Sequence, residues 1–308
     1  MNKTISIVIP IYNEEYILRE LINKLGSSVR ELPFSFELVF INDGSCDNSL
    51  NILLDISNED RRVRIIDLSR NFGHQQAISA GIDHVDSDAV ILMDADMEDD
   101  PEDLPLLINK WQEGYDVVYA VRKSRKVSVL KNACFHLFHS LNKFFSDVPV
   151  ENAGIFGIMD RKVINEIKRL KEKSRYIPGL RSWVGFKQTS VVLERGKRYD
   201  AKSRVHFSKL INLACNSYFG FSKKPIRLAS FFGFLFSFVS FIAALFVVIF
   251  QLVFRFRVSG WASLATILLF VSSMQFICIG VMGEYIGRIF DEVKDRPLYV
   301  VRGVYGKK

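Results

Sequence analysis

The chain has 308 residues, of which 49% are hydrophobic, and its 41 Lys and Arg outnumber its 34 Asp and Glu to give a net charge of +7. This composition excludes an intrinsically disordered chain, a collagen-like repeat and a small disulfide-stabilised scaffold. Uncharged apolar runs are concentrated near the C-terminus, so the preceding part has the composition of an ordinary soluble domain.

Apolar runs of strand length alternate with segments of helical period through the first 125 residues. Glu14–Leu25 and His74–Val85 repeat apolar residues every three or four positions, as amphipathic helices do. Continuous apolar runs are typical of buried parallel strands, so the pattern predicts a doubly wound α/β sheet. The predicted strands are Thr4–Pro10, Phe36–Ile41, Val63–Leu68, Ala89–Met93 and Asp116–Val121.

Polar and acidic residues follow three of these strands, where ligands bind in sheets of this class. Glu14 follows the first strand, Asp43 the second, and Asp94 and Asp96 the fourth. No GxGxxG or Walker loop is present, which argues against a dinucleotide cofactor and against P-loop chemistry. An isolated Asp-x-Asp is usually a solvated turn or a helix cap. Three acidic strand ends in one sheet favour instead a Mg²⁺ or Mn²⁺ site that also holds a diphosphate.

A cation-rich segment follows the fifth predicted strand. Arg122–Lys131 contains five cations and no acid, and Val129–Phe145 then places its apolar residues largely on one helical face. Val205–Phe221 shows a second amphipathic pattern. Both patterns predict helices in the membrane interface, and packing against the soluble domain is the alternative for each.

Two runs without Asp, Glu, Lys, Arg or His lie near the C-terminus, 27 residues at Leu228–Phe254 and 26 at Val258–Gly283. As helices, each would be about 40 Å long, more than the roughly 30 Å hydrocarbon core of a bilayer. We predict two membrane spans rather than two buried core helices. Cations outside the spans outnumber those in the turn, which predicts a multi-pass protein of the cytoplasmic (inner) membrane with both termini cytoplasmic.

The predicted organisation has four parts. They are a cytoplasmic α/β domain over 1–204, a juxtamembrane amphipathic segment over 205–227, two spans within 228–287 (about 228–254 and 258–283), and a cytoplasmic tail over 288–308. Gly280, Gly283 and Gly287 would allow close contact between helices, which is compatible with a homo-oligomer. The lipid bilayer is an expected partner, and nucleic acid is not.

Four motifs in this order resemble those of the family 2 glycosyltransferases. They are Ile7–Glu15, Ile41–Ser49, Arg70–Gly81 and Asp94–Asp103. Trp183–Thr189, the predicted spans and Gly283–Tyr299 extend the resemblance, so that the whole chain is similar to the polyprenyl-phosphate glycosyltransferases, relatives of dolichol-phosphate mannose synthase. The resemblance implies a GT-A-type (Rossmann-like) nucleotide-sugar domain that faces the cytoplasm.

The resemblance also implies roles for single residues. Asp94 would contact the sugar nucleotide, Asp96 with Glu98 would bind Mg²⁺ or Mn²⁺, and Asp94 and Asp96 are the implied catalytic residues. Most relatives have Gln where Glu98 stands, and a surface position is the alternative for this side chain. The implied contacts to the nucleotide base and ribose are Pro10, Tyr12, Glu14 and Asp43, and the predicted acceptor-phosphate residues are Arg122, Arg125, Arg198 and Lys202.

The implied reaction is inverting transfer of a hexose or N-acetylhexosamine from a UDP- or GDP-linked sugar to polyprenyl (undecaprenyl or dolichyl) phosphate. Relatives often carry an acid, proposed as the catalytic base, where Ile155 stands here, and Asp160 is a weaker substitute. Because the second pKa of a phosphate monoester is about 6, the nucleophile is already deprotonated near neutral pH. We therefore predict activity without a dedicated base. The alternatives are transfer to another membrane lipid or glycan, and a non-catalytic, membrane-anchored protein that binds nucleotide sugars.

Overall fold

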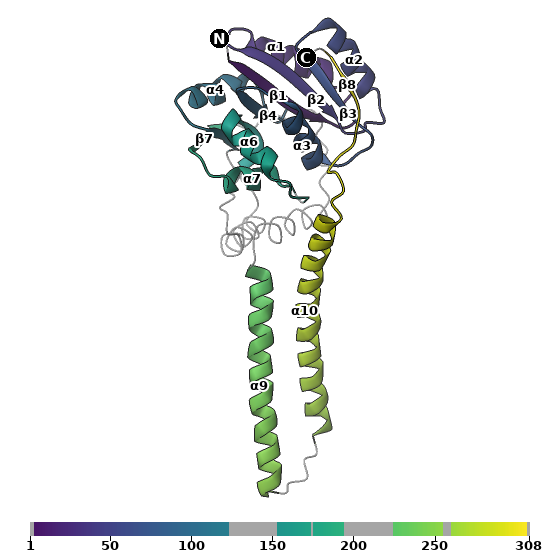
Figure 1. Cartoon of the computed structure of the whole chain (residues 1–308), viewed down its shortest axis with the longest axis vertical. Coiled ribbons are helices and arrows are strands. Elements are labelled where there is room, and N and C mark those ends of the chain that lie inside the picture. Colours follow the sequence, from purple (N-terminus) through teal and green to yellow (C-terminus); the bar gives the residue numbers. More distant parts are fainter. Residues whose placement is uncertain (1–2, 123–152, 174, 194–223, 255–259, 307–308) are drawn as a thin grey trace, which may run out of the picture. The chain divides into compact units, whose positions relative to one another are not determined.

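The computed structural model describes residues 3–122, 153–173, 175–193, 224–254 and 260–306. The chain divides into two compact units (Figure 1). The first contains the sheet and its helices and comprises Met1–Leu137, Val148–Leu210 and Arg296–Lys308. The second contains two long helices and comprises Phe138–Asp147 and Ile211–Asp295.

A mixed sheet of eight strands organises the first unit, in the order β7-β5-β6-β4-β1-β2-β3-β8. Strands β1 to β4 are parallel to their neighbours within this group, whereas β6 is antiparallel to β4 and β5, and β8 is antiparallel to β3. The strands are β1 (Thr4–Ile11), β2 (Ser35–Asn42), β3 (Val63–Leu68), β4 (Ala89–Leu92), β5 (Val117–Arg122), β6 (Ala153–Asp160), β7 (Gln188–Leu193) and β8 (Val301–Tyr305).

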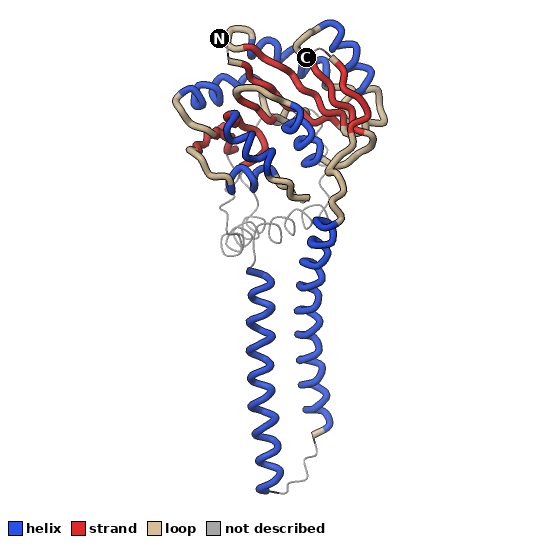
Figure 2. Tube along the Cα trace, in the orientation of Figure 1, coloured by secondary structure: helices blue, strands red, loops and turns tan. Residues whose placement is uncertain are grey.

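Helices cover both faces of this sheet (Figure 2). On one face α1 contacts α2 and α4, and on the other α3 contacts α6, which in turn contacts α7. The change of face follows from right-handed crossovers, because the chain steps from β1 to β3 in one direction and then back to β4. The helices are α1 (Leu18–Val29), α2 (Ser49–Glu59), α3 (His74–His84), η1 (Pro101–Asp103), α4 (Leu104–Gln112), α6 (Arg161–Arg169) and α7 (Ile177–Trp183).

Alternate residues of β1 belong to opposite faces, as the two-residue period of a strand requires. Ile7 and Ile9 are fully buried in one core cluster with Leu21 of α1. Val8 faces α3 on the other side, where Gly81 lies so close that a Cβ atom there would come within 2.3 Å of the Val8 side chain. Glycine at position 81 therefore lets α3 pack directly on the sheet.

The five predicted strands are confirmed, each end lying within one residue of its predicted position. Helix α1 begins at Leu18 rather than Glu14, because the intervening residues form a hydrogen-bonded loop instead. Strands β6, β7 and β8 were not predicted. The last of these lies in the predicted tail, and the structure makes it an edge strand of the sheet.

Two long helices make up the described part of the second unit, α9 (Lys224–Phe254) and α10 (Trp261–Val293). They are antiparallel, since Cys278 Sγ lies 3.6 Å from the Ala229 carbonyl oxygen and the Phe236 and Phe270 rings are 5.9 Å apart. Within the described residues, Phe270–Val293 is long and apolar enough to cross a membrane, and Ile226–Val239 is apolar but shorter. Both predicted spans are thus helical, and the crossing of a bilayer by both stays a prediction.

Candidate active site

The loops after β1, β2 and β4 meet at one edge of the sheet, because these strands are parallel and adjacent in the order β4-β1-β2. Backbone hydrogen bonds extend the pairing beyond the strands, from the Asp43 amide to the Ile11 oxygen (2.8 Å) and from the Met93 amide to the Val8 oxygen (3.2 Å). We call this region the acidic edge. The predicted residues in it are Pro10, Tyr12, Glu14, Asp43, Asp94, Asp96 and Glu98.

The loop after β1 is bound to the loop after β2 at several points. Asn13 has a left-handed backbone, with φ of 56°, and its amide donates to Ser45 Oγ while its side-chain oxygen accepts from the Cys46 amide. The Glu14 amide donates to Ser49 Oγ at 3.0 Å. These bonds hold Tyr12, which is 43% exposed, beside Asp43, the residue that follows β2.

Asp43 is buried, and both of its carboxylate oxygens accept backbone hydrogen bonds. Oδ1 accepts from the Phe72 amide (2.7 Å) and Oδ2 from the Gly73 amide (3.0 Å), just before α3. Gly44 has φ of +64°, and a Cβ atom there would lie 2.4 Å from the Arg70 carbonyl carbon. Asp43 therefore anchors the loop between β3 and α3, a role that is compatible with a nucleotide contact through the remaining acceptor capacity.

The residues after β4 alternate in burial. Asp94, Asp96 and Glu98 are half-exposed, whereas Ala95 and Met97 are buried. Asp96 Oδ1 accepts from the Glu98 amide at 3.1 Å, and Met97 adopts a left-handed backbone with φ of 59°. The turn thus directs a series of carboxylates away from the core at the carboxyl end of β4.

His74, the first residue of α3, lies at the acidic edge although it was not among the predicted site residues. Its Nε2 atom is 3.0 Å from Asp94 Oδ1. Burial lowers the pKa of His74, and the negative charges of Asp43 and Asp96 oppose that shift. The sequence could have indicated His74, because this residue follows Gly73 inside a segment that resembles the family. The resemblance gave His74 no role.

The carboxylates of the acidic edge are compatible with a divalent cation. Within the described residues, no three His, Cys, Asp or Glu side chains gather into a complete metal-binding group. Mg²⁺ usually takes one or two carboxylates together with substrate phosphates and water, so Asp96 and Glu98 would suffice as protein ligands once a diphosphate is bound. The hard carboxylate oxygens also suit Mn²⁺.

The C-terminal strand reaches the acidic edge from the far side of β3. Arg302 of β8 donates to the Ser69 carbonyl oxygen at 2.7 Å and lies 3.6 Å from Asp67 Oδ2. Asp67 is fully buried, and its Oδ1 accepts from the Asn42 side chain at 2.7 Å. Asn42 in turn accepts from the Ser45 amide. A chain of polar contacts therefore connects β8 to the loop after β2.

Asp160, the substitute base suggested by the sequence, lies at the wrong end of the sheet. It pairs in register with Ala89, the first residue of β4, because β6 is antiparallel to β4. Its oxygens accept from the Trp111 indole (3.0 Å) and from the Lys162 amide, where it caps α6. Asp160 is therefore a structural residue. Ile155, near the start of β6, is half-buried at the opposite end, the one that adjoins the acidic edge.

The end of β5, the start of β6 and α7 form a second region, which we call the basic edge. Arg122 ends β5, paired in register with Leu193 of β7. The other predicted acceptor residues, Arg125, Arg198 and Lys202, lie outside the residues that the structure describes. Both predicted amphipathic helices also lie outside them.

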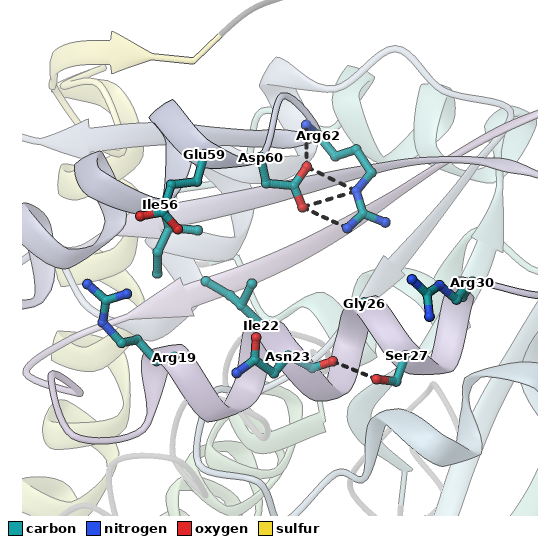
Figure 3. A pocket seen from close by; sticks show the side chains of 10 residues that line it. All are labelled: Arg19, Ile22, Asn23, Gly26, Ser27, Arg30, Ile56, Glu59, Asp60 and Arg62. Atoms are coloured by element: carbon teal, nitrogen blue, oxygen red, sulfur yellow. Dashed lines mark hydrogen bonds and ion pairs between the residues drawn. The ribbon is translucent and has the colours of Figure 1, made fainter.

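A groove of about 440 Å³ lies between α1 and α2, apart from both edges (Figure 3). Arg62 forms a forked ion pair with Asp60 on one wall, which lowers the pKa of that carboxyl. The lining residues include none of the predicted site residues. They are Arg19, Ile22, Asn23, Gly26, Ser27, Arg30, Ile56, Glu59, Asp60 and Arg62.

Comparison with known proteins identifies the family. Residues 6–166, which contain most of β1, all of β2 to β4 and the acidic edge, match the family described as "Glycosyl transferase family 2". The chain belongs to glycosyl transferase family 2. In this family 2 glycosyltransferase, the four motifs of the sequence analysis all fall within the matched residues, and they carry the loops of the acidic edge.

Relatives extend the match of this family 2 glycosyltransferase to nearly its whole length. The uncharacterized glycosyltransferase YkcC of Bacillus subtilis is 44% identical, over 98% of this chain and 94% of its own. The bactoprenol glucosyl transferase of Shigella phage SfII is 40% identical, over 97% of each chain. A crystal structure of glucosyl-3-phosphoglycerate synthase from Mycobacterium tuberculosis is 18% identical with a TM-score of 0.44, covering 70% of this chain and 76% of that one. A likeness that distant adds nothing to the assignment.

Proposed function

We propose that this chain transfers a hexose or N-acetylhexosamine from a nucleoside diphosphate sugar to the phosphate of a polyprenyl phosphate, with inversion at the anomeric carbon. The observation that carries the proposal is the 40% identity, over 97% of each chain, to a protein named bactoprenol glucosyl transferase. Bactoprenol is a polyprenyl alcohol. UDP-glucose and UDP-N-acetylglucosamine are the first donors to test, followed by GDP-linked sugars.

The acidic edge supplies the donor side of this reaction. Tyr12, Glu14 and Asp43 would contact the nucleotide, together with Pro10. A divalent cation held by Asp96 and Glu98 would neutralise the negative charge that develops on the leaving diphosphate. The contact with His74 would fix the orientation of Asp94 against the sugar. Holding donor and acceptor in line accounts for much of the expected rate.

The acceptor phosphate needs little help to become a nucleophile. One of its oxygens attacks the anomeric carbon while the bond from that carbon to the diphosphate breaks. With a second pKa of about 6, the phosphate is mostly dianionic at neutral pH. The aliphatic Ile155 at the start of β6 and the structural role of Asp160 support a mechanism without a carboxylate base. For such a mechanism, the transfer rate should rise once with pH, near the second pKa of the phosphate. No essential group should titrate well above that pKa.

We further propose that α9 and α10 anchor the enzyme in the cytoplasmic membrane. Phe276 and Leu264 of α10 are 73% and 70% exposed, as lipid-facing side chains would be. This proposal includes two spans with both termini cytoplasmic. It also includes the predicted boundaries between the four parts of the chain, after residues 204, 227 and 287. A Cβ atom added at Gly280, Gly283 or Gly287 would meet no other described residue within 4 Å, which leaves these faces available for helix contact between copies.

The deciding experiment is a transfer assay with the purified full chain. Radiolabelled UDP-glucose, UDP-N-acetylglucosamine and GDP-mannose are each incubated with undecaprenyl phosphate and Mg²⁺, and the labelled lipid is extracted. We expect one donor to label the lipid. Asp96→Ala should lower that rate by about 10³-fold, the scale on which removal of transition-state electrostatics acts.

Glu102→Ala is the matched control, because Glu102 is an exposed acid in the same acidic run as Asp96. It should retain wild-type activity. Labelling of another lipid or glycan instead of undecaprenyl phosphate would replace the proposed acceptor. Nucleotide-sugar binding without transfer to any acceptor would support the non-catalytic alternative, and equal activity of Asp96→Ala and wild type would remove the cation site.

A further inference from the structure

Two arginines six positions apart are almost completely buried, Arg175 at 6% and Arg181 at 4% exposure. A buried guanidinium is costly unless an opposite charge and hydrogen bonds compensate it. The surroundings of the two side chains therefore show whether each charge is satisfied within the protein.

Arg175 has a carboxylate partner. Its Nη1 lies 3.4 Å from both oxygens of Asp83, and its Nη2 donates to the Leu170 carbonyl oxygen. Asp83 also accepts from the Tyr299 hydroxyl at 3.1 Å. Arg175 therefore belongs to a structural ion pair, in which α3 is joined to the residues before α7 and to the segment after α10.

Arg181 has no carboxylate partner among the residues that the structure describes. Its Nη1 lies 3.5 Å from the Gly154 carbonyl oxygen, and its guanidinium carbon is 4.7 Å from the centre of the Tyr119 ring. Burial lowers the pKa of Arg181 to about 10, against the opposing influence of Tyr119 and Tyr176. The side chain still carries its charge at neutral pH, so this buried cation has no opposite charge beside it within the described residues.

The start of α7 and the strand position of Gly154, which Arg181 contacts, place Arg181 next to the acidic edge. The Ile177 amide, at the start of α7, donates to the side chain of Gln75, which follows His74 in α3. Gly154 lies three residues before Gly157, the residue of β6 that pairs with the end of β4. Arg181 thus belongs to the basic edge, on the side of β4 away from β1 and β2.

We propose that Arg181 binds the phosphate of the acceptor lipid. The inference rests on the proposed function and adds to it a residue that the sequence analysis did not select. A phosphate dianion would supply the missing opposite charge, and the guanidinium fork matches phosphate oxygens. The donor nucleotide is expected over β1 and β2, so an anion at the basic edge belongs to the acceptor.

The test compares Arg181→Met with Arg175→Met in the full chain. For Arg181→Met we expect the KM for undecaprenyl phosphate to rise at least tenfold and the KM for the sugar nucleotide to change less than twofold. Its thermal unfolding midpoint should equal or exceed that of the wild type, because replacing an uncompensated buried charge by an apolar side chain of similar volume removes its desolvation cost. Loss of a purely structural residue would lower the unfolding midpoint and would not raise the acceptor KM alone.

Arg175→Met is the matched control. It leaves Asp83 without its guanidinium, so its unfolding midpoint should fall, while the ratio of the two KM values stays that of the wild type. Arg181→Lys keeps the charge without the fork and should raise the acceptor KM about threefold.

An unchanged acceptor KM in Arg181→Met would overturn the inference, and so would an equal rise in both KM values, which would assign Arg181 to the donor diphosphate. If Arg181→Met fails to fold, Arg181→Lys takes its place in the test. An unchanged acceptor KM in Arg181→Lys would then overturn the inference. Absence of transfer by the wild type would instead overturn the proposed function.

Discussion

The acidic edge and the basic edge of the sheet satisfy their charged groups in different ways. At the acidic edge the Asp43 carboxylate accepts hydrogen bonds from two backbone amides, and Asp94 lies against His74. Contacts inside the protein therefore position these loops and side chains. At the basic edge Arg181 is buried beside a carbonyl and an aromatic ring and meets no carboxylate within the described residues. We therefore propose that the donor side is organised in advance, whereas the acceptor side is completed by an anionic ligand.

Removal of divalent cations tests the acidic edge most severely. EDTA should reduce transfer by about 10³-fold, since the diphosphate would then leave against uncompensated carboxylate charge. The rate of labelled lipid formation measures this, and added Mg²⁺ or Mn²⁺ should restore it. Thermal unfolding in EDTA is the control for stability. Full activity of metal-stripped protein in EDTA would show that the acidic edge works without a cation.

His74→Ala tests whether Asp94 is positioned from within the protein. We expect kcat to fall about tenfold, because a misplaced catalytic group costs rate without necessarily weakening binding. His84→Ala is the matched control, a histidine at the other end of the same helix whose Nδ1 contacts the Ala80 oxygen. If both variants kept wild-type kcat, the contact between His74 and Asp94 would have no catalytic role.

Arg302→Gln would show whether the acidic edge depends on β8. The KM for the sugar nucleotide should rise about fivefold with little change in the acceptor KM, because the contacts from Asp67 through Asn42 lead to the loop after β2. The free energy of unfolding should fall by about 1 kcal/mol, less than for a fully buried pair, since the Arg302 side chain is 56% exposed.

Denaturant unfolding and steady-state kinetics measure both effects of Arg302→Gln. Asp67→Asn added to it should recover stability, because it removes the buried charge and keeps the acceptor for Asn42. Arg296→Gln, in the same C-terminal segment, is the control and should match the wild type. A selective rise in the acceptor KM would contradict the separation of the two edges.

Glu98→Gln should have the smallest effect. Loss of one negative charge near the cation should raise the Mg²⁺ concentration for half-maximal activity about threefold, with kcat unchanged. Glu102→Gln, an exposed neighbour, should leave the Mg²⁺ dependence as it is. Identical Mg²⁺ curves for wild type and Glu98→Gln would place Glu98 outside the cation site.

Prediction from sequence succeeded where local pattern decides the structure. Strand β3 was predicted residue for residue, because Val63, Ile65, Ile66 and Leu68 make a short, β-branched-rich apolar segment of strand length. Helix α1 was predicted four residues too early, since Glu14 and Glu15 use their amides to bind Ser49 and Asp47 in the neighbouring loop. That pairing joins residues more than thirty positions apart, and helical periodicity does not reveal it.

The sequence by itself determined the α/β alternation, the acidic strand ends, the two apolar helices and the family resemblance, because each depends on the order and spacing of residues along the chain. Tertiary structure alone decided that β6 enters between β4 and β5, which sends Asp160 to the far end of the sheet and brings Gly154 to Arg181. It also decided that His74 meets Asp94 and that Arg302 reaches Asp67. The reason is physical: the partner of a charged side chain is set by strand order and direction, which join residues remote in sequence.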